Sequence, residues 1–212
     1  MPPRPFQCHL WPLLSVMAAL ALTGCASDDF TFEADLPGDF QLTGDAQYSG
    51  ANCGDSAGQT VTHHLFETPG HSERPHRVSF QVPLSTHEGG CRRDLSRIQI
   101  RLDGDSADLA GSPRAPDQAF ATLDFRNRLP DAAQRMPDRG ARIFDGRCRW
   151  LQPAPGELLM KERTLQCQAS DLAGSWLEGS PGGSLQRDEL PGRIVRLAIG
   201  MAPDVPATAA GE

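Results

Sequence analysis

Short segments in which apolar and polar residues alternate constrain the fold of this chain more than any other feature. In the clearest, residues 76–84, four apolar side chains share one face of an extended strand: Val78, Phe80, Val82 and Leu84. Alternation with a period of two is typical of strands with one buried and one solvated face. Similar patterns occur at residues 40–48, 60–66, 95–102, 119–126, 142–151, 158–168 and 193–199. The sequence therefore predicts an all-β protein.

Glycine and proline are frequent between these segments. One glycine, Gly44, lies inside the segment 40–48, where we expect it to break the strand. The 212 residues include 21 glycines and 18 prolines, which disfavours a helical bundle or a coiled coil. About eight short strands joined by such connectors are typical of an antiparallel β-sandwich or barrel. We predict a single domain of this kind over residues 39–201. The proline- and alanine-rich residues 202–212 are predicted to form a disordered tail.

The charge of the chain limits its partners. The 27 acidic and 20 basic residues give a formal net charge of -7 at pH 7. Nucleic-acid phosphates attract basic surfaces, so no nucleic-acid partner is expected for an acidic chain. No apolar run reaches the length of about 18 residues that a transmembrane helix needs.

The first 24 residues have the organisation of a signal peptide. A short segment that contains Arg4 precedes an apolar stretch of ten residues, 13–22. A helix of this length rises about 15 Å, which is about half of the hydrocarbon core of a bilayer. The stretch is therefore too short to span a membrane and fits the apolar core of an export signal.

The apolar stretch ends in Leu22-Thr23-Gly24-Cys25. These four residues resemble the lipobox of bacterial lipoproteins, in which an aliphatic residue and two small residues precede a cysteine. The resemblance implies that signal peptidase II cleaves before Cys25 and that Cys25 carries lipid. Two or more acyl chains give stable anchoring to a membrane. The alternative is an ordinary secretory signal with a chance cysteine.

The same resemblance predicts the location of the mature protein. Residues 25–38 are expected to form a lipidated acidic tether, although Phe30 and Phe32 alternate as they would in a strand. In enteric lipoproteins, Asp directly after the lipidated cysteine resembles a signal for retention in the inner membrane. Position 26 of this chain is Ala instead. We therefore expect the outer membrane of a bacterial cell envelope.

Four cysteines remain after Cys25 in a chain that is expected to be exported, so two disulfides are predicted. The turn-forming residues 153–156 lie between Cys148 and Cys167 and predict a hairpin that places these two cysteines opposite each other. Directly opposed cysteines on antiparallel strands are close enough to bridge. We predict the pair Cys148–Cys167 and, by default, the pair Cys53–Cys91. A four-cysteine zinc site is disfavoured because no CxxC spacing occurs.

The segment Gly54-Asp55-Ser56-Ala57-Gly58 looks like the GxSxG nucleophile motif of α/β-hydrolases. That motif lies between an apolar strand and a helix, and the residues around Ser56 predict neither. The hydrolase families also place their histidine late in the chain, whereas no histidine follows His87. A serine hydrolase acting through Ser56 is therefore the least favoured function, and a polar turn next to Cys53 is preferred.

The histidines that follow the signal segment all lie within residues 63–87: His63, His64, His71, His76 and His87. Imidazole is a common ligand of zinc and copper. Neighbouring strands would bring His64 near His76, which makes these two the candidate metal ligands. Adjacent residues of a strand point to opposite faces, however, so His63 and His64 do not share one site. Solvated histidines are preferred, and no metal or other cofactor is expected.

Four arginines lie close together in one predicted strand: Arg92, Arg93, Arg97 and Arg101. They would form a basic stripe suited to an acidic ligand, although a solvated face is preferred. Taken together, the sequence predicts a membrane-anchored envelope lipoprotein with a non-enzymatic binding or structural role. Its partners would be the membrane, through the lipid anchor, and an envelope protein. A periplasmic lipoprotein that binds zinc or copper through residues 63–87 is the first alternative.

Overall fold

The structure is a computed structural model that describes residues 28–50, 61–70, 72–104, 117–129, 135–151 and 164–202. The predicted signal peptide, the tail after residue 202 and the residues Cys25, Cys53, Ser56 and His71 lie outside the described residues. The strands are β1 (Asp29–Leu36), β2 (Phe40–Ser49), β3 (Thr62–Glu67), β4 (His76–Pro83), β5 (Ser85–Glu88), β6 (Cys91–Gly104), β7 (Asp117–Arg126), β8 (Arg142–Leu151), β9 (Thr164–Ala169), β10 (Gly182–Gln186) and β11 (Ile194–Met201). A short 3-10 helix, η2 (Arg187–Glu189), precedes β11. The all-β prediction is confirmed.

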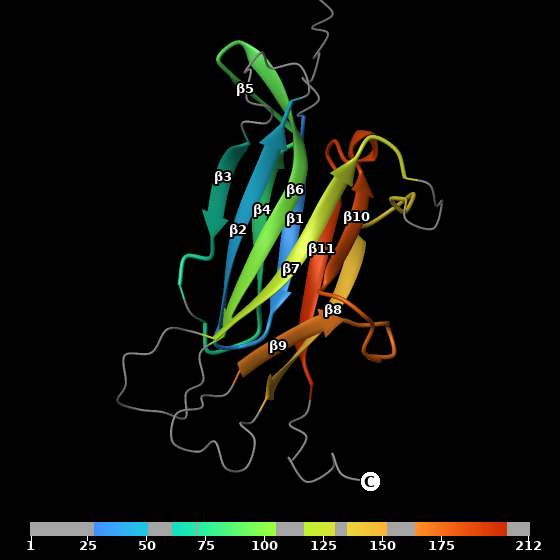
Figure 1. Ribbon diagram of the computed structural model, residues 1–212. Coiled ribbons are helices and arrows are strands. Elements are labelled where there is room, and N and C mark those ends of the chain that lie inside the picture. The colour runs from blue at the N-terminus through green and yellow to red at the C-terminus, as the bar shows by residue number, and fades with distance from the viewer. Residues whose placement is uncertain are drawn as a thin grey trace, which may run out of the picture.

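The strands form two sheets that are not closed into a barrel (Figure 1). The first sheet has the order β4-β1-β11-β8-β9, and the second has the order β10-β7-β6-β2-β3, with β5 paired to β6. The predicted antiparallel arrangement is wrong for three pairs, because β11 runs parallel to β1 and to β8, and β10 runs parallel to β7. An alternating pattern identifies the buried face of a strand and contains no information about the direction of its neighbours.

Strand β1 corrects the predicted start of the domain. The expected tether over residues 25–38 is wrong for residues 29–36, which pair with β4 on one side and with β11 on the other. Phe30 and Phe32 are completely buried in the core between the sheets. The acidic residues that suggested a tether lie on the outer face, where Glu33 accepts a hydrogen bond from Arg196 at 2.8 Å.

Gly44 does not break β2, which continues from Phe40 to Ser49. The residue opposite Gly44 on β3 is Phe66, and its ring lies over the glycine. A Cβ atom at position 44 would approach the Cζ atom of Phe66 to 2.1 Å. The missing side chain therefore makes room for an aromatic ring that also packs on Phe80 with 4.7 Å between ring centroids.

Replacement of Gly44 by alanine is expected to lower the free energy of unfolding by about 1–3 kcal/mol, because Phe66 must leave its position. Chemical denaturation would measure the change. Gly200→Ala on β11 is the matched control, since a Cβ atom there meets no atom within 4 Å. Equal stability of the two variants would show that the Phe66 ring does not occupy this space.

The predicted hairpin of Cys148 and Cys167 is confirmed. The two residues are directly opposite in the antiparallel pair of β8 and β9 and form a disulfide with 4.1 Å between their Cα atoms. Cys91 is also disulfide-bonded. Its predicted partner, Cys53, lies outside the described residues.

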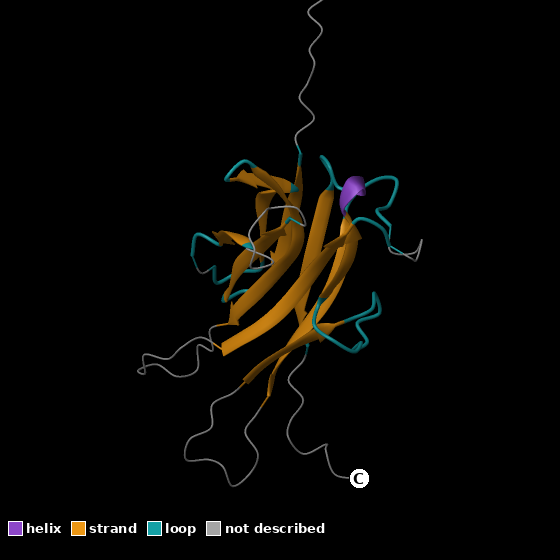
Figure 2. Cartoon of the chain, turned by 45° about the horizontal axis from the view of Figure 1, so that its top comes forward, coloured by secondary structure: helices purple, strands orange, loops and turns teal. Residues whose placement is uncertain are grey.

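The direction of the strands defines two ends of the molecule (Figures 1 and 2). At the Asp28 end, drawn at the top of Figure 1, β1, β8 and β11 begin and β7 and β10 finish. At the Met201 end, drawn at the bottom, β1 and β11 finish. The connection after β10, with η2, returns the chain to the start of β11 at the Asp28 end.

Candidate functional site

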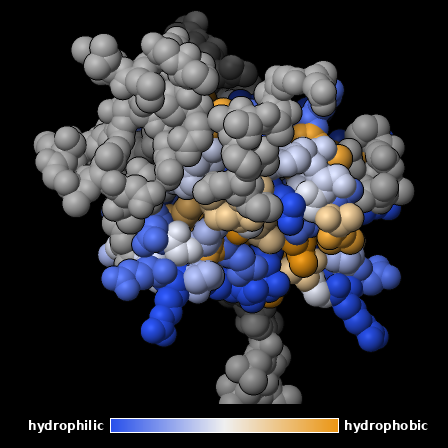
Figure 3. All heavy atoms as spheres, turned by 90° about the horizontal axis from the view of Figure 1, so that it is seen from below, coloured by the Kyte–Doolittle hydropathy of each residue, from blue (hydrophilic) through white to orange (hydrophobic). Residues whose placement is uncertain are grey.

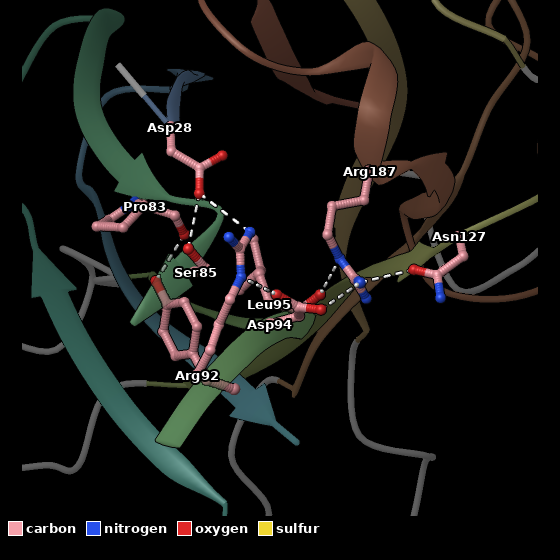
Figure 4. Close-up of polar contacts among 9 residues, drawn as sticks. Asp28, Pro83, Ser85, Arg92, Asp94, Leu95, Asn127 and Arg187 are labelled. Atoms are coloured by element: carbon pink, nitrogen blue, oxygen red, sulfur yellow. Dashed lines mark hydrogen bonds and ion pairs between the residues drawn. The ribbon is translucent and has the colours of Figure 1, made fainter. Parts of the chain in front are cut away.

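A polar network joins several elements at the Asp28 end (Figure 4). Its charged and amide side chains come from separate parts of the chain: Asp28 before β1, Arg92 and Asp94 in β6, Asn127 after β7 and Arg187 in η2. We call these residues the Asp28 cluster. They gather because the strand directions bring all these element ends to one end of the molecule.

Arg92 connects the two carboxylates of the Asp28 cluster. The Oδ2 atom of Asp28 accepts a hydrogen bond from the Ser85 hydroxyl at 2.7 Å and from the Nη2 atom of Arg92 at 3.3 Å. The Nε atom of Arg92 donates to the Oδ1 atom of Asp94 at 3.1 Å. The residue before β1 is therefore held by two side chains that belong to β5 and β6.

Arg187 completes the cluster from the other side. Its Nη1 atom lies 3.3 Å from the Oδ2 atom of Asp94 and donates to the Oδ1 atom of Asn127 at 2.7 Å. Its Nε atom donates to the carbonyl oxygen of Leu95 at 2.9 Å. One arginine thus fastens η2 to β6 and to the residue that follows β7.

The Asp28 cluster lines a pocket of about 330 Å³. Two arginines compensate its two aspartates, and each charge has a partner of opposite sign. The hydroxyl of Ser85 donates to the Asp28 carboxylate and helps to hold the residue before β1 in place. This arrangement suits a clamp that fixes the start of β1 and the position of η2.

Tyr48 of β2 is opposite Leu95 of β6 and is 1% exposed. Its hydroxyl donates to the carbonyl oxygen of Pro83 at 2.9 Å. Burial of the phenol disfavours the charged phenolate and raises the pKa of Tyr48 from 10.0 to about 12. Tyr48 therefore stabilises the fold only while it is protonated.

The titration of Tyr48 can be followed directly, because the chain contains 1 tyrosine. The phenolate absorbance is expected to appear near pH 12 in the folded protein and near pH 10 in denaturant. A raised pKa in the folded state means that the stabilisation is complete below pH 10 and is lost as the pH rises towards 12. Tyr48→Phe should remove this loss of stability, and a native titration at pH 10 would contradict the buried position.

The predicted arginine stripe is present on β6, but acidic residues pair with its members. The Nε atom of Arg97 lies 2.8 Å from Asp124, and that of Arg101 lies 3.0 Å from Asp103. Arg92 belongs to the Asp28 cluster, and Arg93 is buried beside Glu88 at 3.7 Å. Arg97 thus joins β6 to β7, and Arg101 also donates to the Thr43 hydroxyl of β2 at 3.3 Å. The expectation that Arg93 lies on a solvated face is wrong.

The two candidate metal ligands lie on strands that do not pair. His64 is exposed on β3 at the edge of the second sheet, and His76 begins β4 at the edge of the first sheet. His63 is held by Asp45, whose carboxylate lies 2.9 Å from the Nδ1 atom. Within the described ranges, no three histidine, cysteine or acidic side chains are grouped in a way that would hold a metal ion. The same ranges contain no helix that is long and apolar enough to cross a membrane.

A larger pocket of about 790 Å³ lies at the Met201 end. Its apolar lining includes Leu36, Ile199 and Met201. An ion pair forms part of the lining, with the Nε atom of Arg77 2.6 Å from Asp35. Figure 3 shows apolar residues in the middle of this end, with hydrophilic residues around them.

No known protein family, curated protein or solved structure matches this chain. The structure does not group the candidate metal ligands His64 and His76 into a metal site, and Cys25, Cys53 and Ser56 lie outside the described residues. The Asp28 cluster and the pocket at the Met201 end are therefore the features that bear on function.

Proposed function

We propose that this protein is a lipid-anchored β-sandwich of the bacterial envelope, with a non-enzymatic binding or structural role. The observation that carries the proposal is the ordered position of Asp28, which lies three residues after Cys25 and is bound by Ser85 and Arg92. A lipid on Cys25 would leave almost no free tether. The described part of the chain begins three residues after Cys25, at Asp28.

The length of the chain between Cys25 and Asp28 sets the distance to the membrane. Three extended residues span at most about 11 Å. Acyl chains on Cys25 would therefore keep Asp28, the first residue of the cluster, within about 11 Å of the anchor. Because the cluster clamps β1 to β6 and η2, the whole Asp28 end would face the membrane.

The disulfides support a location outside the cytoplasm. The Cys148–Cys167 bond and the disulfide-bonded Cys91 are typical of proteins in an oxidising compartment such as the bacterial periplasm. Ala26 favours an outer-membrane position, as in lipoproteins without an aspartate after the cysteine.

The opposite end of the molecule would project away from the membrane. Strands β1 and β11 run from the Asp28 end to the Met201 end, so the pocket of about 790 Å³ lies at the far end of the sheets from the anchor. A partly apolar pocket in this position is accessible to an envelope partner. This geometry favours a binding or scaffolding role over a reaction at the membrane surface.

Replacement of Cys25 by alanine tests the proposal. Wild-type protein is expected to incorporate labelled palmitate and to fractionate with the outer membrane, whereas Cys25→Ala should lose the label. Cys8→Ala is the matched control, because Cys8 would leave with the signal peptide and its replacement should change neither result. A Cys25→Ala protein that still incorporates palmitate would contradict lipidation at this residue.

A further inference from the structure

The described residues of the Asp28 end carry more basic than acidic side chains, whereas the chain is acidic overall. Its strand ends and connections contain nine arginines: Arg92, Arg93, Arg126, Arg128, Arg135, Arg139, Arg142, Arg187 and Arg193. The same regions contain seven acidic residues: Asp28, Asp29, Glu88, Asp94, Asp138, Asp188 and Glu189. The described part of this end therefore has a net charge of +2, whereas the whole chain has a net charge of -7.

Three exposed arginines of this end, Arg126, Arg128 and Arg139, form no ion pair or side-chain hydrogen bond with the residues that the structure describes. In the rest of the described ranges, the arginines other than Arg74 have polar or aromatic partners. Arg196 pairs with Glu33 at 2.7 Å, for example, and Arg149 lies 4.9 Å from the Trp176 ring centroid. Arg74, in the turn before β4 at the Met201 end, is the comparable exposed arginine at the other end.

The fold places these three side chains near η2. Arg126 ends β7 and pairs with Gln186 of β10. Gln186 also accepts a hydrogen bond from the backbone nitrogen of Leu129, which lies next to Arg128.

Arg139 reaches the same end through a different connection. The backbone nitrogen of Met136 donates to Glu189 of η2 at 2.9 Å, and Arg193 donates to the carbonyl oxygen of Pro137. The segment before β8 is therefore attached to η2 and to the start of β11. We call Arg126, Arg128 and Arg139 the basic rim.

We propose that the basic rim binds the phosphates of anionic phospholipids and so fixes the orientation of the protein on the membrane. The inference rests on the lipid anchor proposed above, because the anchor brings this end within reach of the bilayer. A guanidinium group binds phosphate through several donors at once, and basic residues close to an anionic bilayer are attracted to it. The remainder of the acidic chain is repelled by the same surface, which favours one orientation.

The test compares the full lipidated protein in vesicles of phosphatidylcholine alone and in vesicles that also contain about 30% phosphatidylglycerol. Phenylglyoxal modifies accessible arginines, and peptide mass spectrometry gives the rate at each site. We expect the rates at Arg126, Arg128 and Arg139 to fall about fivefold when phosphatidylglycerol is present, with no change at Arg74. High salt should remove the difference, because it screens exposed charges.

Two single variants provide a matched pair for the same comparison. Arg128→Gln should weaken the protection of Arg126 and Arg139 by phosphatidylglycerol, whereas Arg74→Gln, which also removes one exposed arginine, should not. Equal modification rates in both kinds of vesicle would overturn recognition of anionic lipid while leaving the anchor in place. A wild-type protein that associates with neither kind of vesicle would overturn the anchor and the basic rim together.

Discussion

Replacement of Phe32 by alanine is expected to lower the free energy of unfolding by about 3–5 kcal/mol. Phe32 is 0% exposed in the middle of β1, between β4 and β11. Its ring lies 5.8 Å from that of Phe66 and 6.4 Å from that of Phe80, measured between centroids. Phe66 belongs to the second sheet and Phe80 to the first, so the cavity would open in the contact between the sheets.

Phe120→Ala is the matched control for this change. Phe120 lies on β7 and is 47% exposed, so its removal should cost less than about 1 kcal/mol. Chemical denaturation of both variants would give the difference. If Phe32→Ala were as stable as Phe120→Ala, residues 29–36 would be a tether and not a central strand.

Removal of the Cys148–Cys167 disulfide is expected to cost about 3 kcal/mol. The bond joins residues separated by 19 positions and fixes β9, which is the edge strand of the first sheet. Without the bond, the unfolded chain regains the freedom of the loop that the cysteines close. The variant with both cysteines replaced by alanine should therefore unfold at lower denaturant concentration, and the hairpin of β8 and β9 should lose protection from hydrogen exchange first.

Peptide mapping without reduction provides the control for the disulfide. We expect a Cys148–Cys167 fragment and no free thiol in the mature protein. A Cys91–Cys148 fragment would contradict the pairing of β8 with β9. An alanine double variant as stable as the wild type would show that the strand pairing alone holds the hairpin.

The alternation of apolar residues predicts most of the strands, because a strand with one buried face has an apolar residue at every second position. All of the predicted segment 76–84 except Leu84 lies in β4, and the predicted pairing of Cys148 with Cys167 is confirmed. Strand β1 was missed even though Phe30 and Phe32 alternate, because its outward residues are acidic. Arg196 compensates Glu33 there, and this partner is 163 positions away.

The parallel strand pairs and the Asp28 cluster are not predictable from one sequence, because their partners are far apart along the chain. Arg187 lies 93 positions from Asp94 and 60 from Asn127, and no local pattern connects them. The prediction that Gly44 breaks the strand is wrong because the ring that fills the space beside it comes from Phe66 on another strand.

Intact mass spectrometry of the protein purified from its own membrane tests the central claim most directly. The account predicts a chain that begins at Cys25 and carries the added mass of a diacylglyceryl group, with or without a further acyl chain on the amine. A mature chain that begins at another residue, or that begins at Cys25 without added lipid, would contradict the anchored orientation.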